Sequence, residues 1–411
     1  MRSHAKALST AVAVFVTVAA VLVLTGRDQG ASASRSAATP AAEGQRLTAR
    51  ADAELQKVRE TGDPSRYQRA QDALRRAERL TPRDPGVYVG LGTLALARHD
   101  FRAALRDGMT AQRLGPKLVR HLAVVVDAQV ELGRYAAAAR SLQRMVDLKP
   151  NLPSYARVSY FRELHGDLSG AVAAMRLAVS AGGGAPENVA YAQTLLGGLE
   201  FARGRVGAAR AAYATALQSF PRFLPAEAGL GRLDAARGRY APAIKRLSGV
   251  VDRLPFPEHV IALGEAQQAA GQSAAANDTF ALVDAERRLL AANGVNTDVE
   301  IALFEADHGD RGRGVRLARS AWTRAPSVRS ADALGWTLTR TGHAKQALPW
   351  ARRAVRLGSR DGVVLTHAGL TARAAGDRGT ARRLLRRALA LNPRFSPVWA
   401  PRARRALRSV S

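Results

Sequence analysis

Residues 209–221 read ARAAYATALQSFP and carry the pattern that decides the fold. The small residues Ala209 and Ala216 flank the larger Tyr213, at the i, i+4 and i+7 spacing that places three side chains on one face of a helix. Pro221 follows, and a proline cannot continue a helix. The segment therefore predicts a helix that presents small side chains to a close neighbour and ends before the proline.

The same spelling recurs along the chain, at residues 70–82 and 381–393 and with a valine in the third place at 243–255. Two markers share its period: prolines stand 34 residues apart at Pro82, Pro116 and Pro150, and a glycine lies midway through most units. Each unit is predicted to be a pair of helices, the first ending at the glycine and the second before the proline. The midway glycines are Gly133, Gly166, Gly204, Gly238, Gly271, Gly309, Gly342 and Gly376.

The predicted first helices carry Leu-Gly at a fixed place, as in Leu196-Gly197, Leu230-Gly231 and Leu334-Gly335, where a missing side chain lets two backbones approach. Together these patterns resemble the tetratricopeptide repeat family, whose 34-residue unit reads W-x2-L-G-x2-Y and then A-x3-F-x2-A-x4-P. The match spans residues 51–395, about ten units, although the opening Trp is mostly replaced and the middle Tyr is lost. The resemblance implies an all-α protein, a right-handed α-solenoid of about ten hairpins.

Three segments interrupt or end the array. Gly182-Gly183-Gly184 lies in an interruption of the repeat at 181–187. This interruption is either an insertion loop or a hinge between two halves of the array. Residues 284–293 are expected to lengthen the second helix of unit seven until Gly294 stops it. Residues 396–411, with Trp399 and several arginines, fit a basic capping helix and tail, since the ends of a solenoid need a cover.

The amino terminus reads as a membrane segment. A basic tail precedes an uncharged run from Ala7 to Leu24, about 27 Å as a helix and close to the thickness of a bilayer core. Residues 1–25 are thus a signal anchor or a cleaved signal peptide, the run length favouring the anchor and Ala33 marking the candidate cleavage site. The charge distribution places the repeats outside the cytoplasm, in a single-pass membrane protein or, after cleavage, a secreted one. Residues 26–50 are small and polar, and we expect a flexible linker there.

The composition excludes several classes of site. With no cysteine among 411 residues, disulfides, thiolate zinc sites and iron–sulfur clusters are ruled out. The eight histidines show no metal-ligand spacing, and no phosphate-binding loop, nucleophile elbow or paired carboxylates appear. We therefore expect no catalytic residue, no metal and no cofactor, and a protein that is not an enzyme.

The resemblance implies that partners, an extended peptide or a helix, bind in the concave groove lined by the first helices. The repeat frame directs twelve side chains toward it, and exposed aromatics beside charges are typical anchors. Units two and three have Val89/Thr93 and Ala123/Asp127 where relatives that clamp a terminal carboxylate have Lys and Asn, so no such clamp is expected. The predicted groove residues are Tyr160, Glu163, Tyr191, Phe201, Arg232, Glu265, Gln268, Asn296, Arg329, Asp332, Trp336 and Arg373.

Charge suggests a second partner class. The formal net charge is +28, and residues 378–408 hold ten arginines and no carboxylate, which would attract an anionic membrane or cell-wall polymer. Biased composition alone is the other explanation of the basic excess. Nucleic acid is not an expected partner, since aromatics are not interleaved and no recognition motif is present. The predicted anion-binding patch is Arg382, Arg383, Arg386, Arg387, Arg394, Arg402, Arg404 and Arg405.

Overall fold

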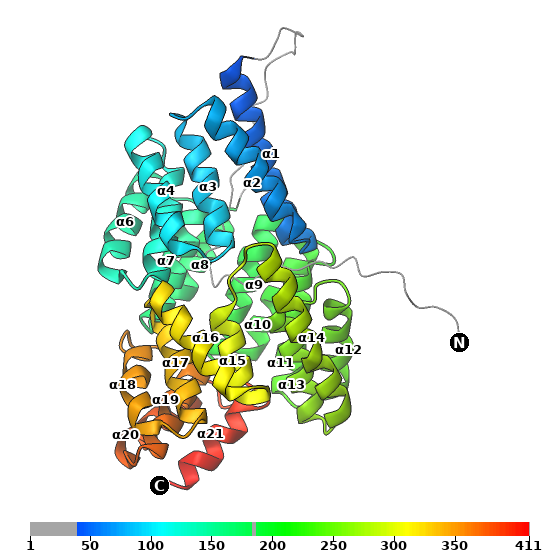
Figure 1. Ribbon diagram of the computed structural model, residues 1–411. Helices are drawn as coiled ribbons and strands as arrows, with labels where there is room; N and C mark the ends of the chain where they lie inside the picture. Colours follow the sequence, from blue (N-terminus) through cyan, green and yellow to red (C-terminus); the bar gives the residue numbers. More distant parts are fainter. Residues whose placement is uncertain (1–38, 183–185, 411) are drawn as a thin grey trace.

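The computed structural model describes residues 39–182 and 186–410, and in these ranges the chain forms 21 helices and no strand. Consecutive helices pair into ten hairpins, α1/α2 to α19/α20, and α21 follows as a single helix (Figure 1). The helices are α1 (Pro40–Thr61), α2 (Ser65–Leu80), α3 (Pro85–Ala97), α4 (Phe101–Leu114), α5 (Arg120–Glu131), α6 (Tyr135–Leu148), α7 (Leu152–Leu164), α8 (Leu168–Ser180), α9 (Pro186–Ala202), α10 (Val206–Ser219), α11 (Leu224–Ala236), α12 (Tyr240–Val251), α13 (Pro257–Ala269), α14 (Ser273–Ala292), α15 (Asp298–His308), α16 (Arg311–Arg324), α17 (Val328–Arg340), α18 (Ala344–Ala354), α19 (Gly362–Ala374), α20 (Arg378–Leu391) and α21 (Trp399–Arg408).

The turns within the hairpins follow the predicted glycines with two exceptions. Seven of the eight midway glycines have positive φ, as a left-handed helix end requires. Gly309 does not, with φ −139°; there the side chain of Asp310 caps α16 by accepting from the Arg313 N–H at 3.1 Å. In the second hairpin His99 takes the left-handed position with φ 59°.

Bulky side chains of second helices sit in the notches left by the glycines of first helices. Tyr213 of α10 lies between Gly197 of α9 and Gly229 of α11, where an added Cβ would approach its ring to 2.6 Å and 2.4 Å. Phe280 fills the same place over Gly264, at 2.3 Å. The small–large–small pattern thus has the predicted role: the large residue needs a glycine opposite, and the flanking alanines are buried.

The linker expected over 26–50 is wrong for its last eleven residues, because α1 begins at Pro40. Thr39 caps this helix, its hydroxyl accepting from the Ala42 N–H at 3.3 Å, and a proline suits the first helical position. The apolar buried stripe of α1 begins at Leu47, so residues 40–46 carry little of the apolar period that predicts a helix.

Several predictions fall on residues outside the described ranges. The signal segment 1–25, the cleavage site at Ala33 and most of the linker lie there, as do residues 183–185 of the interrupted stretch. On either side of that stretch α8 and α9 share one apolar core, which includes Ala178 and Ala192. Among the described residues, no helix has both the length and the apolarity to cross a membrane.

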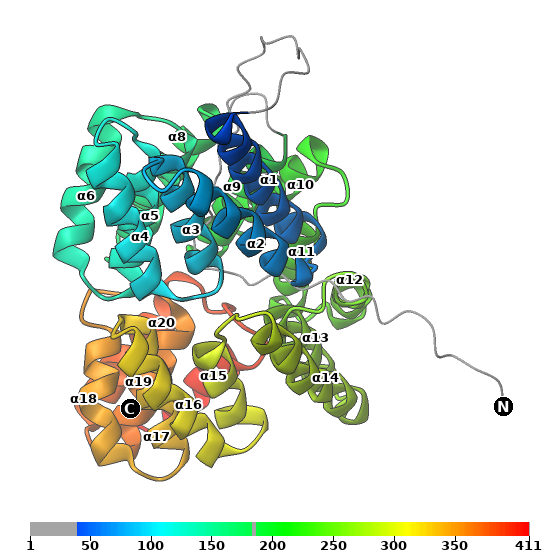
Figure 2. The ribbon, with the colours of Figure 1, turned by 45° about the horizontal axis from the view of Figure 1, so that its top comes forward.

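The array closes on itself after about six hairpins. Helices α1–α8 and α15–α21 lie as two tiers, one above the other, and α9–α14 connect them (Figures 1 and 2). Turns within the upper hairpins, and the turn between α9 and α10, meet the segments that precede α15, α17, α19 and α21; we call these contacts the seam. Its four pairs bring together His99 and Asn296, Gly133 and Pro326, Gly166 and Gly358, and Gly204 and Leu391.

Backbone approach and hydrogen bonds hold the seam. A Cβ added to Gly133, Gly166 or Gly204 would lie 2.3–2.4 Å from the carbonyl oxygen opposite, whereas at Gly238 and Gly271 it would meet no atom within 4 Å. The Asn296 N–H donates to the Arg98 carbonyl at 3.0 Å and the Val328 N–H donates to the Tyr135 hydroxyl at 2.9 Å. The seam therefore joins segments that are far apart in the sequence, 193 residues in the case of Tyr135 and Val328.

The C-terminal helix α21 packs on α19 and α20. Ala403, Ala406 and Val410 belong to one buried cluster with Leu385 of α20. The carboxy-terminal residues thus cover the apolar edge of the last hairpin with a basic helix.

Candidate functional site

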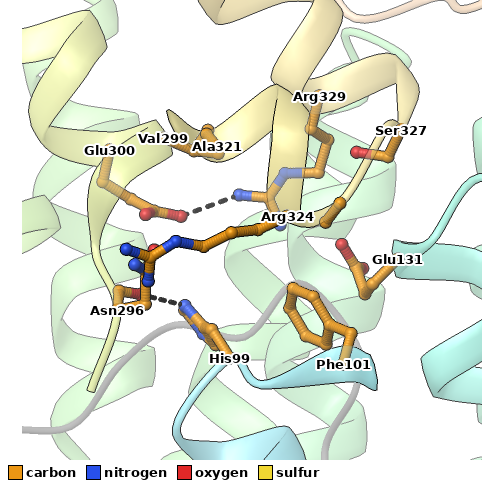
Figure 3. Close-up of a pocket in the computed structure, with 11 residues that line it drawn as sticks. His99, Phe101, Glu131, Asn296, Val299, Glu300, Ala321, Arg324, Ser327 and Arg329 are labelled. Atoms are coloured by element: carbon orange, nitrogen blue, oxygen red, sulfur yellow. Dashed lines mark hydrogen bonds and ion pairs between the residues drawn. The ribbon is translucent and has the colours of Figure 1, made fainter. Parts of the chain in front are cut away.

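The inner surface beside the seam carries a cluster of charged side chains, of which Glu131 is buried and Glu300 and Arg329 are half-buried (Figure 3). Arg329 of α17 pairs with Glu300 of α15 at 3.1 Å. Tyr160 of α7 donates its hydroxyl to Glu131 of α5 at 3.2 Å. Burial raises the pKa of Glu131, while Arg329 and Tyr160 act against that rise. Burial would lower the pKa of Arg329, but Glu131 and Glu300 outweigh it, so the guanidinium stays charged. This cluster joins the two tiers electrostatically.

The cavity within this cluster measures only about 40 Å³, which suits a water molecule and not a peptide side chain. His99 closes one side by donating from Nδ1 to the Asn296 carbonyl at 2.6 Å, and burial lowers the pKa of His99, which favours the neutral ring. Phe101 and Arg324 complete the wall. The seam cavity is part of the fold and offers no room for a ligand.

Three predicted groove residues belong to this seam. Tyr160 is 6% exposed. The Asn296 N–H donates to the Arg98 carbonyl of the upper tier, and the Arg329 guanidinium interacts with the carboxylates of Glu131 and Glu300. The expectation of an exposed anchor at Tyr160 is therefore wrong. The Tyr160 side chain points inward, as the repeat frame predicts. In the closed superhelix, however, its ring is buried in a cluster with Tyr135 and Val328.

Trp336 and Asp332 of α17 are likewise buried. The Trp336 ring, 4% exposed, stacks on His367 of α19 at 4.5 Å with an interplanar angle of 7°, and its edge contacts Trp399 of α21. Asp332 accepts from His367 Nδ1 at 3.0 Å. Burial alone would lower the pKa of His367, but Asp332 outweighs it and raises the pKa, so the pair is an ion pair when the ring is protonated. Trp336 is thus a packing residue and not the exposed anchor that we expected.

Two predicted groove carboxyls have perturbed acidities. Burial raises the pKa of Glu163 to about 7, with the Asp361 carboxylate adding to the rise. Burial also raises the pKa of Glu265 to about 7; Asp307 adds to this, and Arg402 opposes it. The two residues stand on different first helices, α7 and α13, and do not form a pair. Both side chains are half-buried, and this partial loss of hydration holds each pKa above its ordinary value.

The other predicted groove residues are scattered along the first helices. Tyr191 and Phe201 are half-buried on α9, and the Phe201 carbonyl accepts from Asn392 at the seam at 2.7 Å. Arg232 is half-buried on α11, and Gln268 is exposed on α13. Arg373 is exposed on α19 and donates to the Ser409 hydroxyl at 3.1 Å. These five residues do not form one site.

A separate pocket opens between α17, α19 and α21, with a volume of about 390 Å³. We call it the C-terminal arginine pocket. It brings together the predicted groove residues Trp336 and Arg373 with the predicted patch residues Arg402 and Arg405. Its lining also includes Arg340, Leu370 and Ala406, and none of these seven residues is acidic.

One buried carboxylate behind this pocket positions its walls. Asp307 accepts from Trp336 Nε1 at 3.0 Å and from Arg402 at 3.3 Å, and lies 3.4 Å from Arg340 Nε. The Arg402 guanidinium lies 4.6 Å from the centre of the Trp399 ring, and that of Arg340 lies 5.7 Å from Trp336. No sequence pattern marks Asp307, because it stands alone at the end of a first helix with no motif around it.

The predicted anion-binding patch is divided between two elements. Arg382, Arg383, Arg386 and Arg387 are exposed on α20, whereas Arg402, Arg404 and Arg405 lie on α21. Arg387 donates to the carbonyls of Gly358 and Ser359, and Arg404 donates to that of Pro393 at 2.7 Å. Arg394 is exposed in the connection between the two helices. Of these eight arginines, only Arg402 and Arg405 reach the C-terminal arginine pocket.

A metal site is not formed by the described residues, which contain no group of three or more histidine, aspartate or glutamate side chains placed to hold an ion. The perturbed carboxyls Glu163 and Glu265 stand on different hairpins.

The chain is similar to several solved structures at low sequence identity. No family model matches the sequence, and no curated protein matches it. Among solved structures, it is similar to a thermophilic TPR protein of Thermus thermophilus, with 23% identity, 50% of this chain and 97% of that one covered, and a TM-score of 0.38. PilW, a type IV pilus biogenesis factor, gives 18% identity, coverage of 51% and 97%, and a TM-score of 0.42. A tetratricopeptide repeat protein from Parabacteroides merdae is 14% identical, with 63% of this chain and 98% of that one covered and a TM-score of 0.36.

Two of these three structures are named as tetratricopeptide repeat proteins. The helical hairpin array described above fits that family by its own pattern of elements. At identities below 25% and TM-scores below 0.5, the likenesses themselves carry no argument about this chain.

Proposed function

We propose that this chain is a non-catalytic scaffold that holds partner proteins outside a membrane, to which residues 1–25 anchor it. The observation that carries the proposal is the array itself: ten hairpins turn their first helices toward a common inner surface and end in an arginine-lined pocket. Helical arrays of this kind present extended surfaces to peptides and helices. The apolar run at 7–24 supports the anchor, and cleavage after Ala33 would make the protein secreted.

Site-directed crosslinking tests the scaffold proposal. The chain has no cysteine, so a single cysteine carries a photoreactive group to one place only. Gln268→Cys and Arg373→Cys place it at exposed positions of first helices, and Leu148→Cys, 53% exposed on the second helix α6, is the matched control. We expect the same partner proteins to be captured from the first-helix positions and not from the control. Equal capture from all three positions would contradict binding along the inner surface.

Protease accessibility in sealed membrane vesicles tests the topology. The proposal predicts that the repeats are digested from the extracytoplasmic side while the short N-terminal tail is protected. Digestion from the cytoplasmic side only would refute the proposed location.

A second candidate function is binding of an anionic membrane or cell-wall polymer through the C-terminal end. It is favoured by the exposure of Arg382, Arg383, Arg386 and Arg387 in a stretch with no carboxylate. Such binding depends on counterion release and should collapse as salt rises. Sedimentation with anionic vesicles or cell-wall fragments tests this candidate: binding at low salt that is lost at high salt would support it, and no binding at low salt would refute it.

A further inference from the structure

The C-terminal arginine pocket has more positive charge than the protein itself neutralises. Four guanidiniums line it, and the carboxylate of Asp307 is shared between Arg340 and Arg402. Arg373 and Arg405 are exposed at its mouth, and Arg405 has no hydrogen-bond or ion-pair partner among the described residues. Burial lowers the pKa of Arg340; Asp307 opposes this effect, and the neighbouring Arg311 and Arg402 add to it. An incoming anion would relieve this crowding of like charge.

Two of the four guanidiniums, those of Arg340 and Arg402, are held in position by the protein itself. Arg402 uses Nη1 toward Asp307, and Arg340 uses Nε toward Asp307 and the Ala306 carbonyl. Each guanidinium therefore has further N–H groups that can donate to a ligand. Their planes lie beside the rings of Trp399 and Trp336, an arrangement that limits rotation of the guanidinium. Fixed, forked donors are suited to carboxylates, which they bind in bidentate geometry.

The aromatic residues of the pocket favour a peptide over a nucleic acid. Binding of single-stranded nucleic acid needs aromatic faces on which bases stack. Trp336 stacks face to face with His367, and Arg340 also lies over its ring, so a base has no open face to use. A flat membrane surface is also disfavoured, because the Arg340 and Arg402 side chains are only 29% and 30% exposed.

The size and the apolar wall indicate what accompanies the charge. A pocket of about 390 Å³ is within the range of small-ligand sites and has room for a few side chains. Leu370 and Ala406 provide apolar surface between the arginines. We propose that the C-terminal arginine pocket binds an acidic peptide segment of a partner protein, with carboxylates paired to Arg340, Arg373, Arg402 and Arg405 and an apolar side chain against Leu370. This inference rests on the proposed scaffold function.

Fluorescence anisotropy with the full chain in mild detergent tests this proposal. The probe is a labelled peptide with the sequence Asp-Glu-Leu-Asp-Glu, and the matched probe is Asn-Gln-Leu-Asn-Gln. We expect the acidic probe to bind and the amide probe not to bind. Arg373→Gln combined with Arg405→Gln should weaken binding about tenfold, as the loss of two charge-assisted contacts implies.

The matched control removes the same charge elsewhere. Arg382→Gln combined with Arg386→Gln changes two exposed arginines of α20 that lie outside the pocket lining, and should alter affinity less than about threefold. Unchanged thermal unfolding of both double variants shows that they fold. Equal weakening by the two pairs, or equal binding of the amide probe, would overturn the pocket proposal. The proposal would also be overturned if a short RNA or anionic vesicles bound the Arg373→Gln, Arg405→Gln variant more weakly than the unchanged protein while the acidic probe bound both equally well.

The proposal can fail separately from the scaffold function. If a photoreactive group at Gln268→Cys captures the same partners with and without the Arg373→Gln, Arg405→Gln changes, and the acidic probe does not bind, the pocket proposal is refuted and the scaffold stands. If no partner is captured from any first-helix position, the scaffold proposal fails.

Discussion

Replacing Gly166 by alanine tests whether the seam is formed as described. Gly166 and Gly271 occupy equivalent turns, with φ 77° and 82°, so alanine incurs the same left-handed backbone penalty at both, about 1 kcal/mol. They differ in surroundings. A Cβ on Gly166 would stand 2.3 Å from the Gly358 carbonyl oxygen, whereas nothing lies within 4 Å at Gly271. The matched pair isolates the seam contact from the backbone effect.

The expected difference follows from that distance. The Gly358 carbonyl must retreat by about 1 Å to reach a normal contact, and forced displacement of packed backbone costs about 1–3 kcal/mol. Urea unfolding followed by circular dichroism should place Gly166→Ala below Gly271→Ala by this amount. If the seam opens to relieve the strain, small-angle X-ray scattering should show a larger radius of gyration for Gly166→Ala alone. Two variants that agree in both measurements would refute the reasoning.

Three further predictions concern the packing and titration of the array. Ala209→Leu should lower the free energy of unfolding by about 1–3 kcal/mol, because residue 209 is fully buried, and Ala208→Leu on the exposed side of the same helix should change it little; equal urea midpoints would show that the repeat frame is wrong. Glu163 has its folded pKa raised from 4.5 to about 7, so the folded state binds more protons between these values and its contribution to stability falls as pH rises through that window. Glu163→Gln should remove this slope and be the more stable form at about pH 8 by about 1–3 kcal/mol, and a variant with an unchanged pH profile of thermal unfolding would contradict the assignment. Arg157→Met leaves Asp127 buried without its bidentate partner (2.6 and 2.9 Å) and should cost about 3–5 kcal/mol, most of it restored by the additional change Asp127→Leu; a double variant as unstable as the single one would count against this.

The local structure was readable from the sequence because hairpins are encoded by neighbouring residues. The glycine and proline periods predict where helices end, and the alanine pattern predicts which side chains pack; Tyr213 and its two glycines bear this out. The long helix of unit seven also ends before Gly294 as expected. At Gly309 the turn is not left-handed, and the Asp310 side chain caps the start of α16. The sequence around this turn resembles that around the left-handed turns, so the pattern does not distinguish the two.

The closure of the superhelix was not predictable in the same way. The seam joins loops and turns that are distant in the chain. Each of the seam hydrogen bonds described above has a backbone group on at least one side, so no pair of complementary side chains marks the seam in the sequence. Glycines at seam turns and at open turns look alike in sequence, as Gly166 and Gly271 do. The same closure contributes to the burial of Tyr160, which shares a core cluster with Val328 of the opposite tier. Trp336 is buried by His367 and Trp399 of its own tier, and no repeat pattern indicates that contact.

A distance measurement between the two tiers tests the closed superhelix most directly. Arg134 and Thr323 are exposed on the two sides of the Gly133–Pro326 contact, and the chain has no cysteine to interfere with nitroxide labels at Arg134→Cys and Thr323→Cys. Pulsed electron paramagnetic resonance should give one narrow distribution at short distance. In an open solenoid, the labels would be five hairpins apart, or roughly 50 Å at about 10 Å for each hairpin. A distribution centred there, or a broad one, would contradict closure through the seam.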